Sequence, residues 1–199
     1  FSPERLDELI IQNLEKHDQD TQVALIKLIT PESGPQAARD LIPILSADRP
    51  ETTIAILKLI HRHGIKVGDN PVISGLVSSS HPVIRGFAAA CIHADHPENL
   101  EQFITEGLDK QDPAHRQSGI ICAGLSRSKK WIPELKSMLE TPGIDPVIPD
   151  IIIALSRLNA DEINALAGDY LTHARADVRM AALDAMSIVD DDTLLKTVL

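Results

Sequence analysis

Aromatic side chains are scarce in this chain. Its 199 residues include one Trp, one Tyr and three Phe. A folded core therefore has to be filled by aliphatic side chains, and with 43% hydrophobic residues there are enough of them to do so. Ala, Ile and Leu are the commonest of these, which suits the close packing of helix against helix.

The chain also contains few cysteines and fewer basic than acidic residues. Two cysteines fit a reducing compartment, so we expect a cytoplasmic protein. The formal net charge is −10. A chain this acidic is repelled by phosphate backbones, which argues against a nucleic-acid partner and favours a partner with basic or mixed charge.

No apolar run approaches the roughly 20 residues that cross a bilayer. The most apolar stretch, residues 147–158, contains Pro149, Asp150 and Arg157. We therefore expect no membrane insertion. No signal peptide is visible, and the chain begins at Phe1 without methionine, so we expect that it is excised from a longer polypeptide.

What the chain does have is a repeat. Similar segments recur every 30 to 33 residues, each beginning at the head of an apolar run. A repeat of 20 to 50 residues is typical of stacked supersecondary units rather than one globular core. The first positions of these segments, called anchors below, are Gln19, Pro50, Pro82, Pro113, Pro146 and Ala176.

Each anchor begins a predicted helix. Apolar or small residues recur 2, 5, 6, 9 and 10 positions after the anchor, and these alternating steps of three and four describe one face of an α-helix. Asp112-Pro113 and Asp145-Pro146 each supply an N-cap acceptor followed by a proline at the first helical position. In the segment that begins at Pro82, the apolar face consists of Ile84, Phe87, Ala88, Cys91 and Ile92.

A second helix is expected after each of these first helices. Short turns join the two members, and residues 4–16 form an unpaired helix before the first complete pair. We therefore expect one all-α domain over residues 1–199, an α-α superhelix (solenoid) of about six helix pairs. The predicted second helices are residues 35–46, 71–79, 97–108, 131–140, 161–172 and 191–199.

Two segments of the chain resemble a known repeat. Residues 112–116, Asp-Pro-Ala-His-Arg, and residues 131–139, Trp-Ile-Pro-Glu-Leu-Lys-Ser-Met-Leu, are similar to HEAT-like repeats of the short bacterial, phycobilisome-lyase type. The resemblance implies the superhelix and covers nearly the whole chain. It indicates fold more than function, since such repeats serve scaffolds, regulatory arms, chromophore lyases and DNA glycosylases.

The family's arginine, three positions after the anchor, is only partly kept. Arg85, Arg116 and Arg179 match it, whereas Gln22, Thr53 and Pro149 occupy the position elsewhere. These arginines could form an anion-binding row. We favour the alternative, an internal ladder of ion pairs with the turn acids Asp112, Asp145 and Asp177.

Histidines and cysteines gather in the middle of the sequence. A zinc site there is one reading, because zinc prefers nitrogen and sulfur ligands. Histidines at helix ends and in loops are the reading we favour, with Cys91 and Cys122 as buried free thiols at the same position of consecutive repeats. We expect no metal and no cofactor. The histidines are His61, His63, His81, His93 and His96.

No catalytic motif is present. Residues 78–81, Ser-Ser-Ser-His, lack a nucleophile elbow, and the glycines form no phosphate-binding loop. We therefore expect a protein without enzymatic activity.

One candidate surface lies eight positions after the anchor, where the first helices should face solvent. Lys27, Lys58 and Asp184 stand there in the outer repeats, but Ala90, Ile121 and Ala154 stand there in the middle ones. These three define a weakly polar convex strip, through which another domain or a second copy of the chain could dock. A small apolar surface without a role is the alternative.

The second candidate surface is the groove built from the second helices. We expect a scaffold or regulatory module that binds a protein partner there, or another domain of the same polypeptide. The alternatives are a chromophore-lyase-like or other HEAT-repeat enzyme, or a purely structural role. The candidate binding residues are Arg39, Asp40, Glu98, Glu101, Gln102, Arg127, Lys129, Lys130, Trp131 and Glu134, with a half-buried packing role as the favoured reading of Trp131.

Overall fold

The computed structural model describes residues 3–141, 143–159 and 163–198, and the side chains of residues 5–187 within them. These residues form helices and turns and no strand, so the predicted all-α class is confirmed. The chain divides into two compact units, Phe1–Gln102 and Phe103–Leu199, here called unit 1 and unit 2. The single domain over residues 1–199 stays a prediction.

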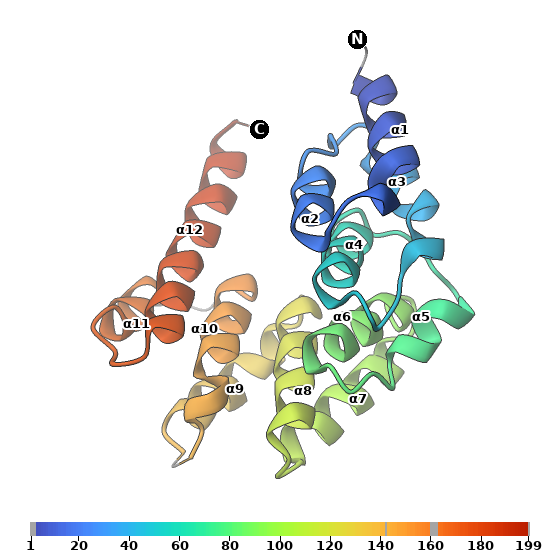
Figure 1. The fold of residues 1–199 in the computed structure, drawn as a ribbon. Helices are drawn as coiled ribbons and strands as arrows, with labels where there is room; N and C mark the ends of the chain where they lie inside the picture. The colour runs from blue at the N-terminus through green and yellow to red at the C-terminus, as the bar shows by residue number, and fades with distance from the viewer. Residues whose placement is uncertain (1–2, 142, 160–162, 199) are drawn as a thin grey trace. The chain divides into compact units, whose positions relative to one another are not determined.

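In unit 1 the helices that begin at anchors pack in succession. Helix α4 (Pro50–Arg62) contacts both α2 (Gln19–Lys27) and α6 (Pro82–Ile92). The second helices are α3 (Gly34–Asp40), which packs on α4, and α5 (Pro71–Leu76), which packs on α6, while α1 (Pro3–Asn13) packs on α3 (Figure 1). The fully buried side chains between them include Leu14, Leu41, Ile56, Leu57, Ile60, Ile73 and Ile84.

Unit 2 repeats this order of contacts. Helix α10 (Ile148–Arg157) contacts α8 (Pro113–Leu125) on one side and α12 (Ala176–Val198) on the other. The second helices α9 (Ile132–Leu139) and α11 (Ile163–Tyr170) pack on α10 and α12 (Figure 1). Helix α7 (Pro97–Asp109) runs from the first unit into the second. Short 3-10 turns lie at Leu14–Lys16 (η1), Ile42–Ile44 (η2), Lys129–Trp131 (η3) and Asp145–Val147 (η4).

The predicted apolar faces are the buried faces. In the segment that begins at Pro82, four of the five predicted positions are buried and Ile92 is half-buried. In α10 all five are buried, including the exception Ser156, whose hydroxyl donates a hydrogen bond of 2.8 Å to the carbonyl oxygen of Ala185. Because that hydroxyl has a partner, the buried polar group costs little.

Several helix bounds differ from the prediction, each for a local reason. Residues 35–46 form α3 and η2 rather than one helix, because Pro43 cannot donate to the helical ladder. Residues 145–147 form η4, so α10 begins two positions after its anchor, with Pro149 in its first turn. The separate helix predicted over 191–199 is wrong: α12 continues to Val198, and it contains neither Gly nor Pro to end it. Residues 161–162 of another predicted helix lie outside the described residues.

Two pairs of helices in unit 2 approach closely at glycine. A Cβ built on Gly119 of α8 would lie 3.0 Å from the backbone of Gly107 in α7. A Cβ built on Gly124 would lie 2.7 Å from the Cα of Ala154 in α10. Both contacts therefore depend on the missing side chain.

Candidate functional site

The candidate binding residues lie on or beside the helices α3, α7 and α9. Arg39 and Asp40 end α3, Glu134 is in the first turn of α9, and all three are exposed. Glu98, Glu101 and Gln102 are exposed on α7, and Lys129 and Lys130 are exposed in η3. Arg127 is exposed in the turn before η3, with a φ of 58°.

Trp131 is buried rather than presented to a partner. Its side chain is 7% exposed, and the Lys130 ammonium lies 4.7 Å from the centre of its ring. The indole nitrogen is buried without a hydrogen-bond partner. The packing role favoured from the sequence fits this position, at the start of α9, better than a binding role.

The convex strip is wrong as a solvent-facing surface. Ala90, Ile121 and Ala154 are 4%, 5% and 1% exposed. Ala154 lies against Gly124, so the flank that carries it is covered by the preceding first helix. The strip therefore offers no docking surface, either to another domain or to a second copy of the chain.

Two of the three arginines after the anchors donate to backbone oxygens. The guanidinium of Arg85 donates 3.1 Å to the carbonyl oxygen of Ser79, and that of Arg179 donates to those of His173 and Ala174 at 2.7 and 2.9 Å. Asp177, predicted as a ladder partner, is instead paired with Arg175. Arg175 also donates to the carbonyl oxygen of Asp145. Two of the three arginines thus hold the turn before their own helix.

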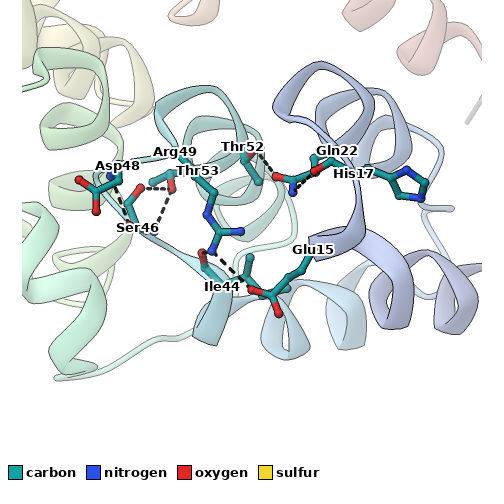
Figure 2. A network of polar contacts seen from close by, with 9 residues as sticks. All are labelled: Glu15, His17, Gln22, Ile44, Ser46, Asp48, Arg49, Thr52 and Thr53. Carbon is teal, nitrogen blue, oxygen red and sulfur yellow. Dashed lines mark hydrogen bonds and ion pairs between the residues drawn. The ribbon is translucent and has the colours of Figure 1, made fainter.

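In two repeats without this arginine, the side chain three positions after the anchor also donates to the turn before its helix. Thr53 donates from Oγ1 to the carbonyl oxygen of Ser46 at 2.7 Å and accepts from the Ser46 N–H at 3.0 Å (Figure 2). Gln22, 2% exposed, donates to the carbonyl oxygen of His17 at 2.8 Å and accepts from the Thr52 hydroxyl at 2.6 Å. The position three after the anchor is therefore structural where Gln22, Thr53, Arg85 and Arg179 stand there.

Arg49 adds a looser contact to the network in Figure 2. Its guanidinium donates 3.1 Å to the carbonyl oxygen of Ile44 and lies 3.5 Å from the Glu15 carboxylate, which is mostly exposed. An exposed pair of this kind adds little stability.

Both thiols are buried and neither is in a disulfide, as predicted. Cys91 lies 3.6 Å from the carbonyl oxygen of Leu57, and burial raises the pKa of its thiol to about 12. Burial also lowers the pKa of His63 and His93, and the neighbouring His96 adds to the effect on His93. Within the described residues, no three His, Cys, Asp or Glu side chains are placed to hold a metal ion.

A half-buried carboxylate of unit 2 lies at the start of α10. Asp150 accepts a hydrogen bond of 2.9 Å from the Gln117 amide of α8. Burial raises the pKa of Asp150 to about 6, despite this bond and the nearby Arg157. The group links two first helices and contacts no hollow described below.

Two hollows of opposite charge lie among the described residues of unit 1. The basic hollow, about 340 Å³, lies between α2 and α4 and is lined by Lys27, Lys58 and Arg62 with a single acid, Glu51. The acidic hollow, about 280 Å³, lies between α1 and α3. It is lined by Asp7, Glu8, Ile11, Glu32, Ser33, Gln36, Ala37 and Asp40.

Of the acidic hollow, only Asp40 was a sequence candidate. Asp7 carries a signal that could have found the rest: it shares the spacing of the buried Ile10 and Leu14, so an acid stands on the apolar stripe of α1. In the structure its side chain is 2% exposed.

No helix in the described part of the chain combines the length and the apolar character needed to cross a membrane. Comparison with protein-family models, with curated proteins and with solved structures finds no match to this chain. The HEAT-like family and the superhelix are therefore still predictions.

Proposed function

We propose that this protein is a non-enzymatic interaction module, built from HEAT-like helix pairs, that binds a protein partner on the polar faces of its second helices. Such modules form superhelices whose stacked second helices offer an extended surface for a peptide or a protein. The partner carries basic groups, since the chain has a net charge of −10.

The observation that carries the proposal is a contrast in burial between first and second helices in the middle of the chain. The first helices α6 and α8 are largely enclosed: residues 84–91 of α6 and 118–125 of α8 are buried without interruption. The second helices instead expose charged side chains, such as Glu98 and Glu101 on α7 and Glu134 on α9. Exposed charges on packed helices are suited to an electrostatically complementary contact with a partner.

The hollows support the same conclusion. Each is open and of the size that a few side chains fill, and the acidic and basic hollows occur within the same unit. A third, about 430 Å³, lies between α9 and α11 and is lined by both signs of charge, with Lys136, Glu140 and Asp169. A protein surface with several protruding charged side chains fits such a set.

Affinity capture from the source organism tests the proposal. The purified chain is immobilised, the bound material is measured by mass spectrometry, and an absorption spectrum of the eluate is recorded. We expect one protein at near-stoichiometric yield that is absent when the chain is heat-denatured before use. A coloured or small-molecule-loaded chain with no protein partner would instead favour a chromophore-lyase-like role and refute the proposal.

A further inference from the structure

Only one of the two carboxylate oxygens of the buried Asp7 accepts hydrogen bonds. Its Oδ2 accepts from the Thr30 N–H at 3.4 Å, from the Thr30 hydroxyl at 3.2 Å and from the Ser33 hydroxyl. Its Oδ1 is buried and has no hydrogen-bond partner. A buried polar atom without a partner is costly, and natural structures keep few of them.

Asp7 lines the acidic hollow, together with three further carboxylates. Glu8 is paired with Arg5 at 2.9 Å, and Asp40 accepts from the Gln36 amide at 2.8 Å. Glu32 is exposed at the rim. Among the described residues that line this hollow, none is Lys or Arg. The hollow therefore concentrates negative charge around an acceptor that lacks a donor.

We propose that the acidic hollow binds an organic cation, the ammonium or guanidinium group of a basic side chain on the protein partner. The inference rests on the proposed function, because it takes the cation from that partner. An ammonium group carries a positive charge and three donors, which suit an acidic lining that holds an acceptor without a donor.

The walls of the hollow favour an organic cation over a metal ion. Ile11 and Ala37 line it beside the acids. Apolar walls suit the methylene stem of Lys or Arg, which packs on apolar surface while its charged end meets the carboxylates. The described carboxylates of unit 1 are not arranged as a set of three that could hold a metal.

A titration of the chain with a lysine analogue tests the site without a partner. The ¹⁵N-labelled protein is titrated with Nα-acetyl-lysine amide at constant ionic strength, and the backbone amide shifts of Thr30 and Ser33 are followed. We expect a saturable shift of both amides. Nα-acetyl-norleucine amide, which has the stem without the ammonium, should leave them in place.

Two double variants complete the test. Glu32→Gln with Asp40→Asn removes two rim charges and should weaken binding roughly tenfold, the effect of losing charge-assisted contacts. Asp48→Asn with Asp69→Asn makes the same change in charge at exposed positions of unit 1 outside the hollow, and should leave the affinity unchanged. Asp7→Asn should abolish the shifts, and the rim variant keeps the test valid if Asp7→Asn does not fold.

Three results would overturn the assignment: no saturable shift, an equal response to the norleucine compound, or equal weakening by both double variants. A stronger response to MgCl₂ at the same amides would replace the organic cation with a metal ion. None of these results bears on whether the chain captures a protein partner, so the site and the proposed function fail separately.

Discussion

At the scale of single residues, several polar side chains are buried, and each has a defined hydrogen-bond partner. Ser156, Thr53 and Gln22 are each buried and each hydrogen-bonded to a backbone oxygen. Asp150 is different, because a carboxylate is charged at neutral pH and burial opposes that charge. The consequences of these groups for stability can be measured one at a time.

Asp150 should make stability fall as pH rises. Its pKa is raised from 3.8 to about 6 in the folded protein, so between these values the native state binds the proton more tightly than the unfolded state. The Asp150→Asn variant should remove this dependence, matching the wild type near pH 4 and exceeding its unfolding free energy at pH 7 by on the order of 2 kcal/mol. Urea unfolding at both pH values measures it. The exposed Asp145→Asn serves as the control, and a difference between the wild type and Asp150→Asn that does not grow from pH 4 to pH 7 would contradict the assignment.

Thr53 should contribute through its hydroxyl alone. Thr53→Val keeps the shape but removes both hydrogen bonds to Ser46, so we expect a loss of about 1 kcal/mol of unfolding free energy. Thr105→Val, at an exposed position of α7, is the matched control and should change stability little. Guanidinium denaturation measures the unfolding free energy of both variants. Equal losses would show that the hydrogen bonds to Ser46 do not account for the effect of Thr53→Val.

At the scale of helices, the closest contacts are made by the smallest residues. Gly124 of α8 faces Ala154 of α10, and Gly119 of α8 faces Gly107 of α7. Glycine normally weakens a helix interior by about 1 kcal/mol relative to alanine, so its use here is offset by packing. Whether a Gly→Ala substitution raises or lowers the free energy of unfolding should therefore depend on how closely a neighbouring helix approaches that glycine.

Gly124→Ala should destabilise unit 2. The added Cβ would lie 2.7 Å from Ala154 Cα, and overpacking of this kind costs about 1–3 kcal/mol, more than the gain in helix propensity. Gly168→Ala, in α11, meets nothing within 4 Å and should be neutral or stabilising by up to about 1 kcal/mol. Thermal melting of both variants decides the matter, and a stabilising Gly124→Ala would disprove the close contact.

The helices and their buried faces could be predicted because they depend on local spacing. The steps of three and four after each anchor recur at Ile84, Ile151 and Val178, all of which are fully buried. The end of α12 was missed because the expected break had no Gly or Pro to enforce it.

Contacts between helices could not be predicted in the same way. Ala90 and Ala154 were placed on an exposed strip because an isolated helix would present them to solvent, yet neighbours cover them. Similarly, Arg179 was paired with the wrong acceptor, since a turn carbonyl lies closer than an acid one repeat away. Which groups come together depends on how closely the helices approach, and that is not encoded in spacing alone.

At the scale of the whole molecule, each unit contains one cysteine that can report on it. Cys91 lies in unit 1 and Cys122 in unit 2, and both are buried. Because only the thiolate reacts, and burial raises the pKa of Cys91 to about 12, its alkylation should be slower than in the unfolded chain by on the order of a thousandfold. Labelling followed by peptide mass spectrometry measures each thiol. Rapid labelling of Cys91 under native conditions would contradict its buried position in α6.

The polar faces of the second helices are what a partner should touch. These faces are acidic on α7 and α9, through Glu98, Glu101 and Glu134, and Asp40 adds a further acid at the end of α3. A basic partner would bring its lysines within bonding distance of these carboxylates. That proximity can be trapped chemically.

The most direct measurement is therefore zero-length carbodiimide cross-linking of the chain to its captured partner, with the joined residues identified by mass spectrometry. The account predicts amide links from Asp40, Glu98, Glu101 and Glu134 to lysines of one protein. It predicts none from Asp48 and Asp69, which are equally exposed acids away from these faces. Links spread evenly over all exposed acids, or no linked protein at all, would contradict the claim that this chain binds a partner through its second helices.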